Sequence, residues 1–397
     1  MPYVISHCEV ILINTVRPKN ARKRDASLTL MPHLVTKPLL DLHGKESRET
    51  LQHSLNPWVK SARMKTCSSL LSILLLFTNC SNKASGEPSI QSAYLGALDV
   101  PPFLLSIVTG CPQNFGDDGM PLVLSVQVKA SSLSPEAFRV ISKNGVHSTP
   151  NCATLEPATE SNELHTILLA GPIADPNDLP DRVEIIGAVE DINGNSLTGL
   201  VSPTVTVGSS AGPALINAYL FNQVGGPAGS SPRALQLVWN GGVTGPSGGD
   251  LGEAELNAIQ LIDCDGNRHV PLGFDDLGDG DNYVELYVPE GIVVNRIEVD
   301  ANFFYDPANF PNQFTSVQVT SLLPSAQAVE LQYDLSSVRF NNVQFLGTPA
   351  LPYRIFFSAD LKNWNCIGSA TADPNTGAFF FEHERELEQR GFYRATP

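Results

Sequence analysis

Five oxygen-bearing side chains that could hold a metal ion lie close together in the sequence. Four carboxylates and one carboxamide occur within eight residues, at Asp275, Asp276, Asp279, Asp281 and Asn282. Oxygen ligands on a flexible loop with glycine suit Ca²⁺, so this stretch is a candidate calcium site. The EF-hand spacing with its closing glutamate is absent, and Asp and Asn also favour turns. A solvated hairpin connection is therefore the alternative, and Ca²⁺ is the only cofactor that the sequence suggests.

A second candidate site is aromatic. Phe303, Phe304 and Tyr305 precede Phe310 and Phe314 in a stretch rich in Asn and Pro. Aromatic faces on a loop can stack on sugar rings. Aromatic side chains are more often buried than exposed, so a small core beneath the loop is the favoured alternative.

Two further acidic segments predict turns. Asp191–Asn195 and Asp263–Asn267 both follow the pattern Asp-x-Asx-Gly-Asn, which resembles a fragment of a calcium loop. Asx-Gly steps are strong turn signals, so hairpin turns are favoured over metal sites at both places.

Motifs for nucleophilic catalysis are not found. The sequence has no Gly-x-Ser-x-Gly elbow, and the histidines after residue 65 are scattered, at His147, His165, His269 and His383. A glycoside hydrolase needs only two carboxylates, but 36 acidic residues follow Lys65. The sequence therefore nominates no catalytic pair.

The cysteines bear on the compartment. Cys111 and Cys152 flank the first predicted β unit and can pair in an oxidising compartment, although two unpaired buried thiols remain the alternative. Cys264 and Cys366 have no evident partner in the sequence. No Cys-x-x-Cys spacing occurs, so a zinc site built on cysteine is not supported.

The opening residues differ from the rest of the chain. A basic start at Met64, an apolar core of about eight residues and a polar exit follow the plan of a secretory signal, which predicts a signal segment over 64–84. Residues 1–63 are then a wrongly assigned or disordered extension; a basic tail with one apolar strand is the alternative. Cys80 is a candidate lipidation site, although Phe77 and Asn79 depart from the bacterial lipobox.

The charge distribution excludes one class of partner. Residues 66–397 contain 14 Lys and Arg against 36 Asp and Glu, a net charge of −22. Nucleic-acid affinity depends on Lys and Arg contacts to phosphates, so a nucleic-acid partner is not expected.

After the signal segment, short apolar runs alternate with Gly, Pro, Asn and Asp. The clearest are Pro121–Lys129, Thr166–Ala170, Arg182–Ile186, Ala234–Trp239 and Tyr283–Val288. Strands of this length and spacing predict an all-β chain of tandem small β-sandwiches. The expected units are residues 85–208, 213–322 and 325–397.

Two of these units resemble known families. Residues 117–207, through Ser131–Val140 and the Asp191–Asn195 turn, resemble bacterial Ig-like domains of surface-layer proteins and adhesins. Residues 325–397, through Pro352–Trp364 and Gly391–Arg394, resemble a C-terminal β module of exported proteins from Verrucomicrobia and Planctomycetes. The resemblances imply sandwich folds and a surface or export-associated role.

These observations together predict a non-catalytic exported protein of the cell surface or extracellular space. Its expected role is adhesion, matrix contact or glycan contact, with a polysaccharide or an envelope protein as partner. Contact with a membrane is expected only through the candidate lipidation site at Cys80. An extracellular carbohydrate-active hydrolase and a purely structural spacer are the two alternatives.

Overall fold

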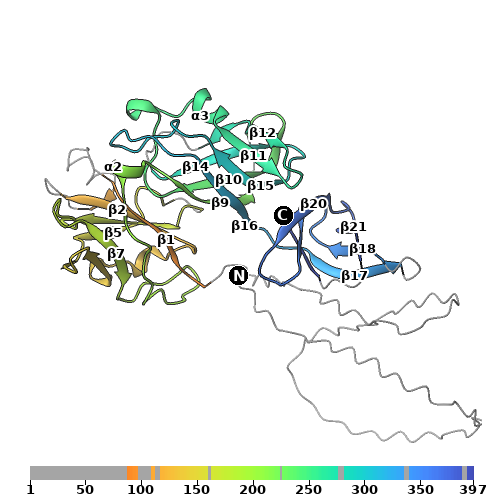
Figure 1. Cartoon of the computed structure of the whole chain (residues 1–397), viewed down its shortest axis with the longest axis horizontal. Coiled ribbons are helices and arrows are strands. Elements are labelled where there is room, and N and C mark those ends of the chain that lie inside the picture. The colour runs from red at the N-terminus through yellow and green to blue at the C-terminus, as the bar shows by residue number, and fades with distance from the viewer. Residues whose placement is uncertain are drawn as a thin grey trace, which may run out of the picture. The chain divides into compact units, whose positions relative to one another are not determined.

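The computed structural model describes most of the chain from residue 87 onward (Figure 1). The described residues are 87–96, 109–111, 117–159, 162–223, 226–275, 281–334, 339–386 and 391–397. They all belong to one compact unit. The predicted extension (1–63), signal segment (64–84) and lipidation site (Cys80) lie outside these ranges. Within them, no helix is long and apolar enough to cross a membrane.

The described chain is all-β and is built as tandem small β-sandwiches, which confirms the predicted fold class. Its α-helices are short, such as α2 (Gly208–Ala211) and α3 (Glu253–Asn257). Three hydrophobic cores follow one another along the chain, within residues 90–205, 215–319 and 326–395. We call the units around them the first, second and third sandwich.

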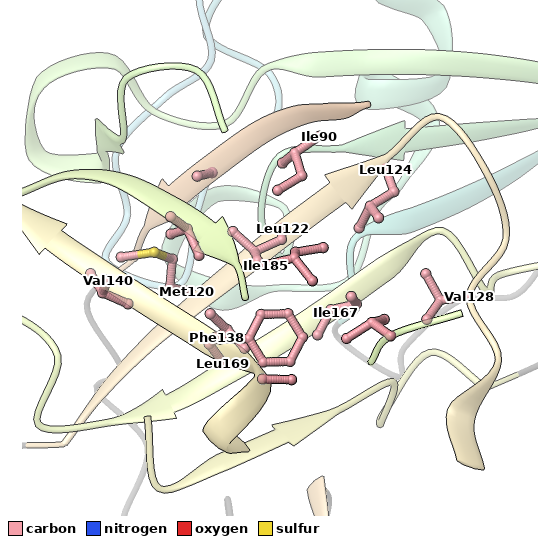
Figure 2. Packing of buried hydrophobic residues seen from close by; sticks show 14 of the residues in the cluster. Ile90, Met120, Leu122, Leu124, Val128, Phe138, Val140, Ile167, Leu169 and Ile185 are labelled. Carbon is pink, nitrogen blue, oxygen red and sulfur yellow. The ribbon is translucent and has the colours of Figure 1, made fainter. Parts of the chain in front are cut away.

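The first sandwich packs a five-stranded sheet against a three-stranded one. The larger sheet has the order β5 (Cys152–Thr154), β6 (Thr166–Gly171), β2 (Asp118–Leu124), β1 (Ile90–Leu95), β8 (Thr206–Val207), and the smaller has β4 (His147–Ser148), β3 (Phe138–Ser142), β7 (Pro180–Ile185). Figure 2 shows how Phe138 and Ile185 from the smaller sheet meet Leu122 and Ile167 from the larger.

Strand β2 is buried on both faces. Successive side chains of a strand point to opposite sides of its sheet. Leu122 and Leu124 therefore enter the core of the first sandwich, whereas Val123 points away from it. Val123 is nevertheless fully buried, in a separate cluster with residues of the second sandwich. The unbroken apolar run of β2 thus serves two contacts.

The second sandwich is one eight-stranded sheet that folds around a single core. Its order is β12 (Arg268–His269), β11 (Ile259–Asp263), β15 (Val294–Val299), β16 (Thr315–Ser321), β9 (Leu215–Asn222), β10 (Ser230–Trp239), β14 (Tyr283–Pro289), β13 (Gly273–Asp275). Leu261 and Ile297 from one half of the sheet share a core with Leu235 and Leu286 from the other half. The parallel pair of β16 and β9 connects the two halves.

The third sandwich packs two three-stranded sheets. Their orders are β17 (Gln327–Asp334), β18 (Arg339–Leu346), β21 (Ala378–Glu386) and β20 (Asn365–Thr371), β19 (Pro352–Ser358), β22 (Phe392–Thr396). Phe379 stacks between Phe345 and Tyr353, with ring centroids 5.2 and 5.0 Å away. Tyr353 and Ile355 point into this core, while Arg354 between them points to the other face.

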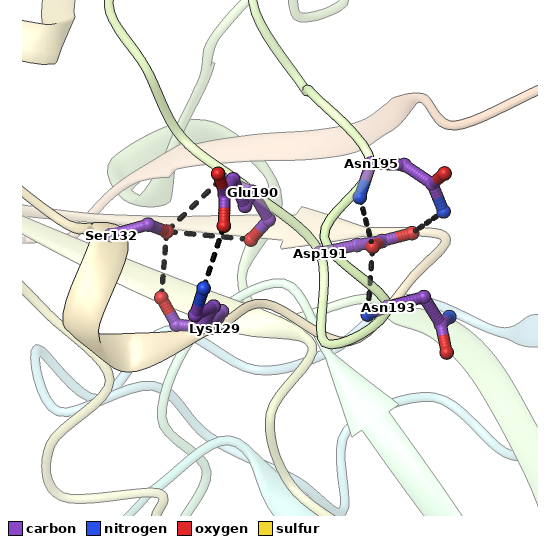
Figure 3. A network of polar contacts seen from close by, with 6 residues as sticks. All are labelled: Lys129, Ser132, Glu190, Asp191, Asn193 and Asn195. Atoms are coloured by element: carbon purple, nitrogen blue, oxygen red, sulfur yellow. Dashed lines mark hydrogen bonds and ion pairs between the residues drawn. The ribbon is translucent and has the colours of Figure 1, made fainter.

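The two Asp-x-Asx-Gly-Asn segments form the same turn. Asp191 Oδ1 accepts the main-chain N–H groups of Asn193 and Asn195, both at 2.8 Å, and Asn195 Nδ2 donates to Asp191 Oδ2 (Figure 3). The carboxylate of Asp263 accepts the equivalent hydrogen bonds from Asp265 and Asn267. Both carboxylates stabilise their own turns.

Two disulfides are present in the described chain. Cys111 is joined to Cys152 within the first sandwich. Cys264 is joined to Cys366, which connects the turn between β11 and β12 to strand β20 of the third sandwich. The expectation that these two cysteines lack a partner is wrong, because the fold brings together residues that are 102 positions apart. Disulfides persist in oxidising compartments, which indicates an exported protein.

Candidate functional site

A long loop between β15 and β16 carries the clustered aromatic side chains; we call residues 300–314 the aromatic loop. Its organiser is Asn312, which is fully buried. Asn312 Oδ1 accepts the main-chain N–H groups of Phe303 (3.0 Å) and Phe304 (2.9 Å), and Nδ2 donates to the main-chain oxygen of Asp300 (2.9 Å). One carboxamide near the end of the loop thus satisfies three main-chain groups near its beginning and fixes the conformation of the loop.

Phe304 is part of the protein core. Its side chain has no exposed surface, and its ring lies 4.8 Å from that of Trp239. The prediction that Phe304 stacks on a ligand is therefore wrong, because the ring is already packed. Phe303 also packs against this core and is partly buried. Tyr305 is partly buried as well, and its hydroxyl donates to the main-chain oxygen of Asn302.

The loop presents other aromatic groups to solvent. Phe310 is 37% exposed and Phe314 is 57% exposed. Each follows an exposed residue with a carboxamide, Asn309 and Gln313 respectively. The loop sequence contains two aspartates and neither Lys nor Arg. This surface therefore combines apolar ring faces with uncharged hydrogen-bonding groups.

Asp306 organises the other half of the loop. It is 1% exposed, and its Oδ1 accepts the main-chain N–H of Phe310 at 2.7 Å. The main-chain oxygen of Asp306 accepts the N–H of Asn309 at 2.8 Å. Its Oδ2 accepts a hydrogen bond from the hydroxyl of Tyr94, which belongs to β1 of the first sandwich, at 2.7 Å. Burial and the neighbouring Asp306 carboxylate raise the pKa of Tyr94, so its hydroxyl stays protonated.

The segment 244–247 of the second sandwich also anchors the aromatic loop. Thr244 and Tyr305 exchange main-chain hydrogen bonds of 2.8 and 2.9 Å. Asn309 Oδ1 accepts the main-chain N–H of Ser247 at 2.8 Å. The aromatic residues of this loop were predicted from the sequence, but these anchors were not. Asx residues placed between aromatic residues were the available signal, because Asx side chains commonly bond to nearby main chain.

An apolar cluster joins the first and second sandwiches, and we call this contact the first junction. It contains Val123 from β2, Ala158, and three side chains on the outer face of the second sandwich, Tyr219, Val238 and Tyr283. All are at most 4% exposed. Buried apolar surface of this kind holds the two sandwiches together as the core of a domain does.

Several hydrogen bonds of polar groups lie at the first junction, and most of them cross it. The hydroxyl of Tyr283 accepts the main-chain N–H of His165 at 3.0 Å and is hydrogen-bonded to Thr166 Oγ1 at 2.9 Å. Asn282 Nδ2 donates to Thr166 Oγ1 (2.9 Å) and to the main-chain oxygen of Trp239 (2.7 Å). These contacts specify how the two sandwiches dock, since leaving them unmade would bury unsatisfied polar groups.

His165 is a neutral histidine in this junction. Its ring stacks on Tyr219 with centroids 4.5 Å apart. Nδ1 lies 3.2 Å from the main-chain oxygen of Leu124, and because this oxygen can only accept, Nδ1 carries the proton. Burial lowers the pKa of His165 to about 4, since the charged ring would be taken out of water.

The predicted calcium stretch is only partly covered. Asp276, Asp279 and the side chain of Asp275 lie outside the described residues. Asp281 and Asn282 are both 5% exposed, and Asp281 Oδ1 accepts the main-chain N–H of Tyr283. Among the described residues, no group of three or more His, Cys, Asp or Glu side chains could hold a metal ion. Calcium binding therefore stays a prediction.

The contact between the second and third sandwiches, which we call the second junction, has a different composition. Arg354 of β19 is 1% exposed, and its Nη1 donates to the main-chain oxygen of Val319 in β16 at 2.8 Å. Its Nε and Nη2 donate to the main-chain oxygen of Pro397 at 3.1 and 2.6 Å. Burial, with the charges of Arg394 and Arg233, lowers the pKa of Arg354 to about 9, so it remains charged at neutral pH. The Cys264–Cys366 disulfide crosses the same junction.

Comparison with known proteins gives little that bears on function. No family model matches the chain, and no curated protein matches it. Several solved structures are similar to it, and three of them are described here. The native alpha-2-macroglobulin of Escherichia coli spanning domains MG0-NIE-MG1 is 12% identical, with 77% of this chain and 97% of that chain covered and a TM-score of 0.17. The dimeric latent PorU of Porphyromonas gingivalis is 8% identical, with 77% and 31% covered and a TM-score of 0.20.

The third similar structure, the FN1–FN3 domains of chicken CNTN1, is 12% identical, with 76% of this chain and 95% of that chain covered and a TM-score of 0.14. At such TM-scores none of these similarities carries an argument about this chain. The β-sandwich architecture therefore stands on the sheets and cores described above. The resemblance of residues 325–397 to a module of particular bacterial lineages stays a prediction.

Proposed function

We propose that this chain is a non-catalytic exported binding protein whose aromatic loop contacts uncharged glycans. The proposal depends on one observation: the main chain of this loop is fixed, while two of its aromatic side chains are exposed. Asn312 and Asp306 fix its main chain from within, while Phe310 and Phe314 are 37% and 57% exposed. A loop that is already ordered loses little conformational freedom on binding.

The chemistry of the exposed groups favours sugars without charge. A sugar ring offers an apolar face to an aromatic side chain and hydroxyl groups to a carboxamide such as that of Gln313. With two aspartates and no basic residue in the loop, an acidic polysaccharide would meet repulsion without compensation. A single exposed aromatic residue is ordinary on a protein surface, so the ordered loop, and not the exposure alone, supports this choice.

The test is a binding assay of the whole chain with a panel of insoluble neutral and acidic polysaccharides, in which bound protein and released sugar are both measured. We expect binding to a neutral polysaccharide without sugar release. Phe314→Ala should weaken it at least about fivefold, which corresponds to about 1 kcal/mol. Phe380→Ala is the matched control, because Phe380 is 54% exposed but lies on the third sandwich.

Other outcomes of this assay decide against the proposal. Release of sugar would make the chain a hydrolase. Binding that the two phenylalanine variants weaken equally would move the site away from the aromatic loop. Absence of binding to every polysaccharide would favour an envelope protein as the partner, or a structural role.

A further inference from the structure

We propose that Tyr94 of the first sandwich is a positioning residue for the aromatic loop of the second, so that the binding surface depends on this one hydrogen bond from the neighbouring sandwich. This inference rests on the proposed function of the loop for its binding consequence. Its structural part, the dependence of the loop on Tyr94, is tested separately below.

The contact that carries the inference is a chain of two hydrogen bonds. The hydroxyl of Tyr94 donates to Asp306 Oδ2 at 2.7 Å, and the main-chain N–H of Phe310 donates to Asp306 Oδ1, also at 2.7 Å. Tyr94 and Asp306 are each 1% exposed. A single carboxylate therefore connects a strand of the first sandwich to the main chain of an exposed aromatic residue in the second.

Main chain packs closely around this pair at two glycines. A Cβ atom on Gly208 would lie 2.6 Å from the Tyr94 hydroxyl and 2.8 Å from Asp306 Oδ2. A Cβ atom on Gly241 would lie 2.7 Å from the ring of Tyr94. Glycine at both positions lets the main chain approach the pair closely. The Asp306 carboxylate is thereby kept away from water. In such surroundings a hydrogen bond is strong, and its loss is costly.

Removing the Tyr94 hydroxyl should consequently loosen the loop. Asp306 would then have a buried Oδ2 without its donor, and its carboxylate would be drawn toward solvent together with the main chain that it holds. The rest of the loop would keep the anchors at Asn312 and Thr244, so the loosening should centre on Asn309 and Phe310.

The experiment compares two buried tyrosines of the same junction in the whole chain. Tyr94→Phe removes the hydroxyl that bonds to Asp306, whereas Tyr283→Phe removes a hydroxyl that bonds to His165 and Thr166. Hydrogen exchange is followed at the Phe310 amide, with the amides of β10 as the reference for an intact second sandwich. We expect Tyr94→Phe to speed exchange at Phe310, relative to β10, by about tenfold or more, the loss expected for one buried hydrogen bond. Tyr283→Phe should leave this ratio unchanged.

A second variant reaches the same pair by steric displacement. Gly241→Ala places a methyl group against the ring of Tyr94 and keeps every hydrogen-bonding group, and it should also raise the Phe310 to β10 exchange ratio. An unchanged ratio in both Tyr94→Phe and Gly241→Ala, or an equal rise in Tyr283→Phe, would overturn the inference.

Glycan binding provides the separate readout. If the proposed function is right, Tyr94→Phe should weaken polysaccharide binding while Tyr283→Phe does not. A changed exchange ratio in a protein that binds no polysaccharide would support the dependence of the loop on Tyr94 and refute the proposed glycan binding. An unchanged ratio in a protein that binds well would do the reverse.

Discussion

The two junctions of this molecule hold their partners by different means. The first junction contains a hydrophobic cluster of its own, surrounded by paired hydroxyl, carboxamide and main-chain groups. At the second junction, none of the hydrophobic clusters among the described residues extends across the contact. A disulfide and the guanidinium group of Arg354 connect the two sides there.

The three sandwiches are therefore not attached to one another in equivalent ways. The first two share buried surface, so we expect them to unfold together and to respond to whatever disturbs that surface. The third is attached through a covalent bond and a few directed hydrogen bonds. Its attachment should therefore depend on redox conditions, to which the first junction has no comparable sensitivity.

The largest expected effect concerns the disulfide of the second junction. Replacing Cys264 and Cys366 together by serine opens a loop with a sequence separation of 102. In the chain-entropy model this removes about 4.7 kcal/mol from the free energy of unfolding. Urea denaturation should then show the third sandwich unfolding before the other two. The double serine variant of Cys111 and Cys152 is the control, and it should destabilise the first sandwich instead. A single shared transition in both variants would contradict the comparison.

The next effect is a pH dependence of the first junction. The pKa of His165 is about 4 in the folded protein against an ordinary 6.5, so the unfolded chain binds a proton at a higher pH than the folded chain. The contribution of His165 to the free energy of unfolding is complete above about pH 6.5 and is lost as the pH falls toward about 4. The total loss is about 3 kcal/mol, of which about 2 kcal/mol is lost by pH 5.

Thermal unfolding measured between pH 7 and pH 5 tests this contribution. His165→Gln, which cannot titrate, should show a weaker pH dependence than the original chain over this interval. Equal pH dependence of the two proteins would mean that His165 is not held neutral at the junction.

The smallest expected effect belongs to Arg354. Arg354→Met keeps an apolar stem but removes the donors to the main-chain oxygens of Val319 and Pro397. Hydrogen bonds to a charged group contribute about 2 kcal/mol, and we expect a loss of this size in the unfolding of the third sandwich. Arg182→Met is the matched control, since the side chain of Arg182 is 42% exposed and its change should cost at most about 0.5 kcal/mol.

Sequence patterns were sufficient for the architecture because its determinants are local. Short apolar runs separated by Gly, Pro, Asn and Asp predicted strands. The pattern Asp-x-Asx-Gly-Asn predicted the turns at Asp191 and Asp263, whose side chains bond to main-chain groups two and four residues away. In each case the physical cause lies within a few residues of the pattern.

The site was less predictable because its determinants are distant in sequence. Tyr94 and Asp306 are 212 positions apart, and neither has a neighbour that marks it as a junction residue. Phe304 and Phe310 look alike in the sequence, yet one packs on Trp239 and the other faces solvent. What separates them is which side chain accepts the main-chain N–H, Asn312 for Phe304 and Asp306 for Phe310, and only the folded loop reveals this.

The Cys264–Cys366 bond also determines how the molecule would respond to a pulling force. Tension applied to the third sandwich from β22 would pass from β20 through the two sulfur atoms into the turn between β11 and β12. The bond would keep the chain between the two cysteines, which are 102 positions apart in the sequence, from being pulled out to its full length. About 340 Å of contour length, at about 3.4 Å per residue, cannot extend until the disulfide is reduced. An exported protein anchored at one end would thus extend much less under shear in an oxidising medium than in a reducing one.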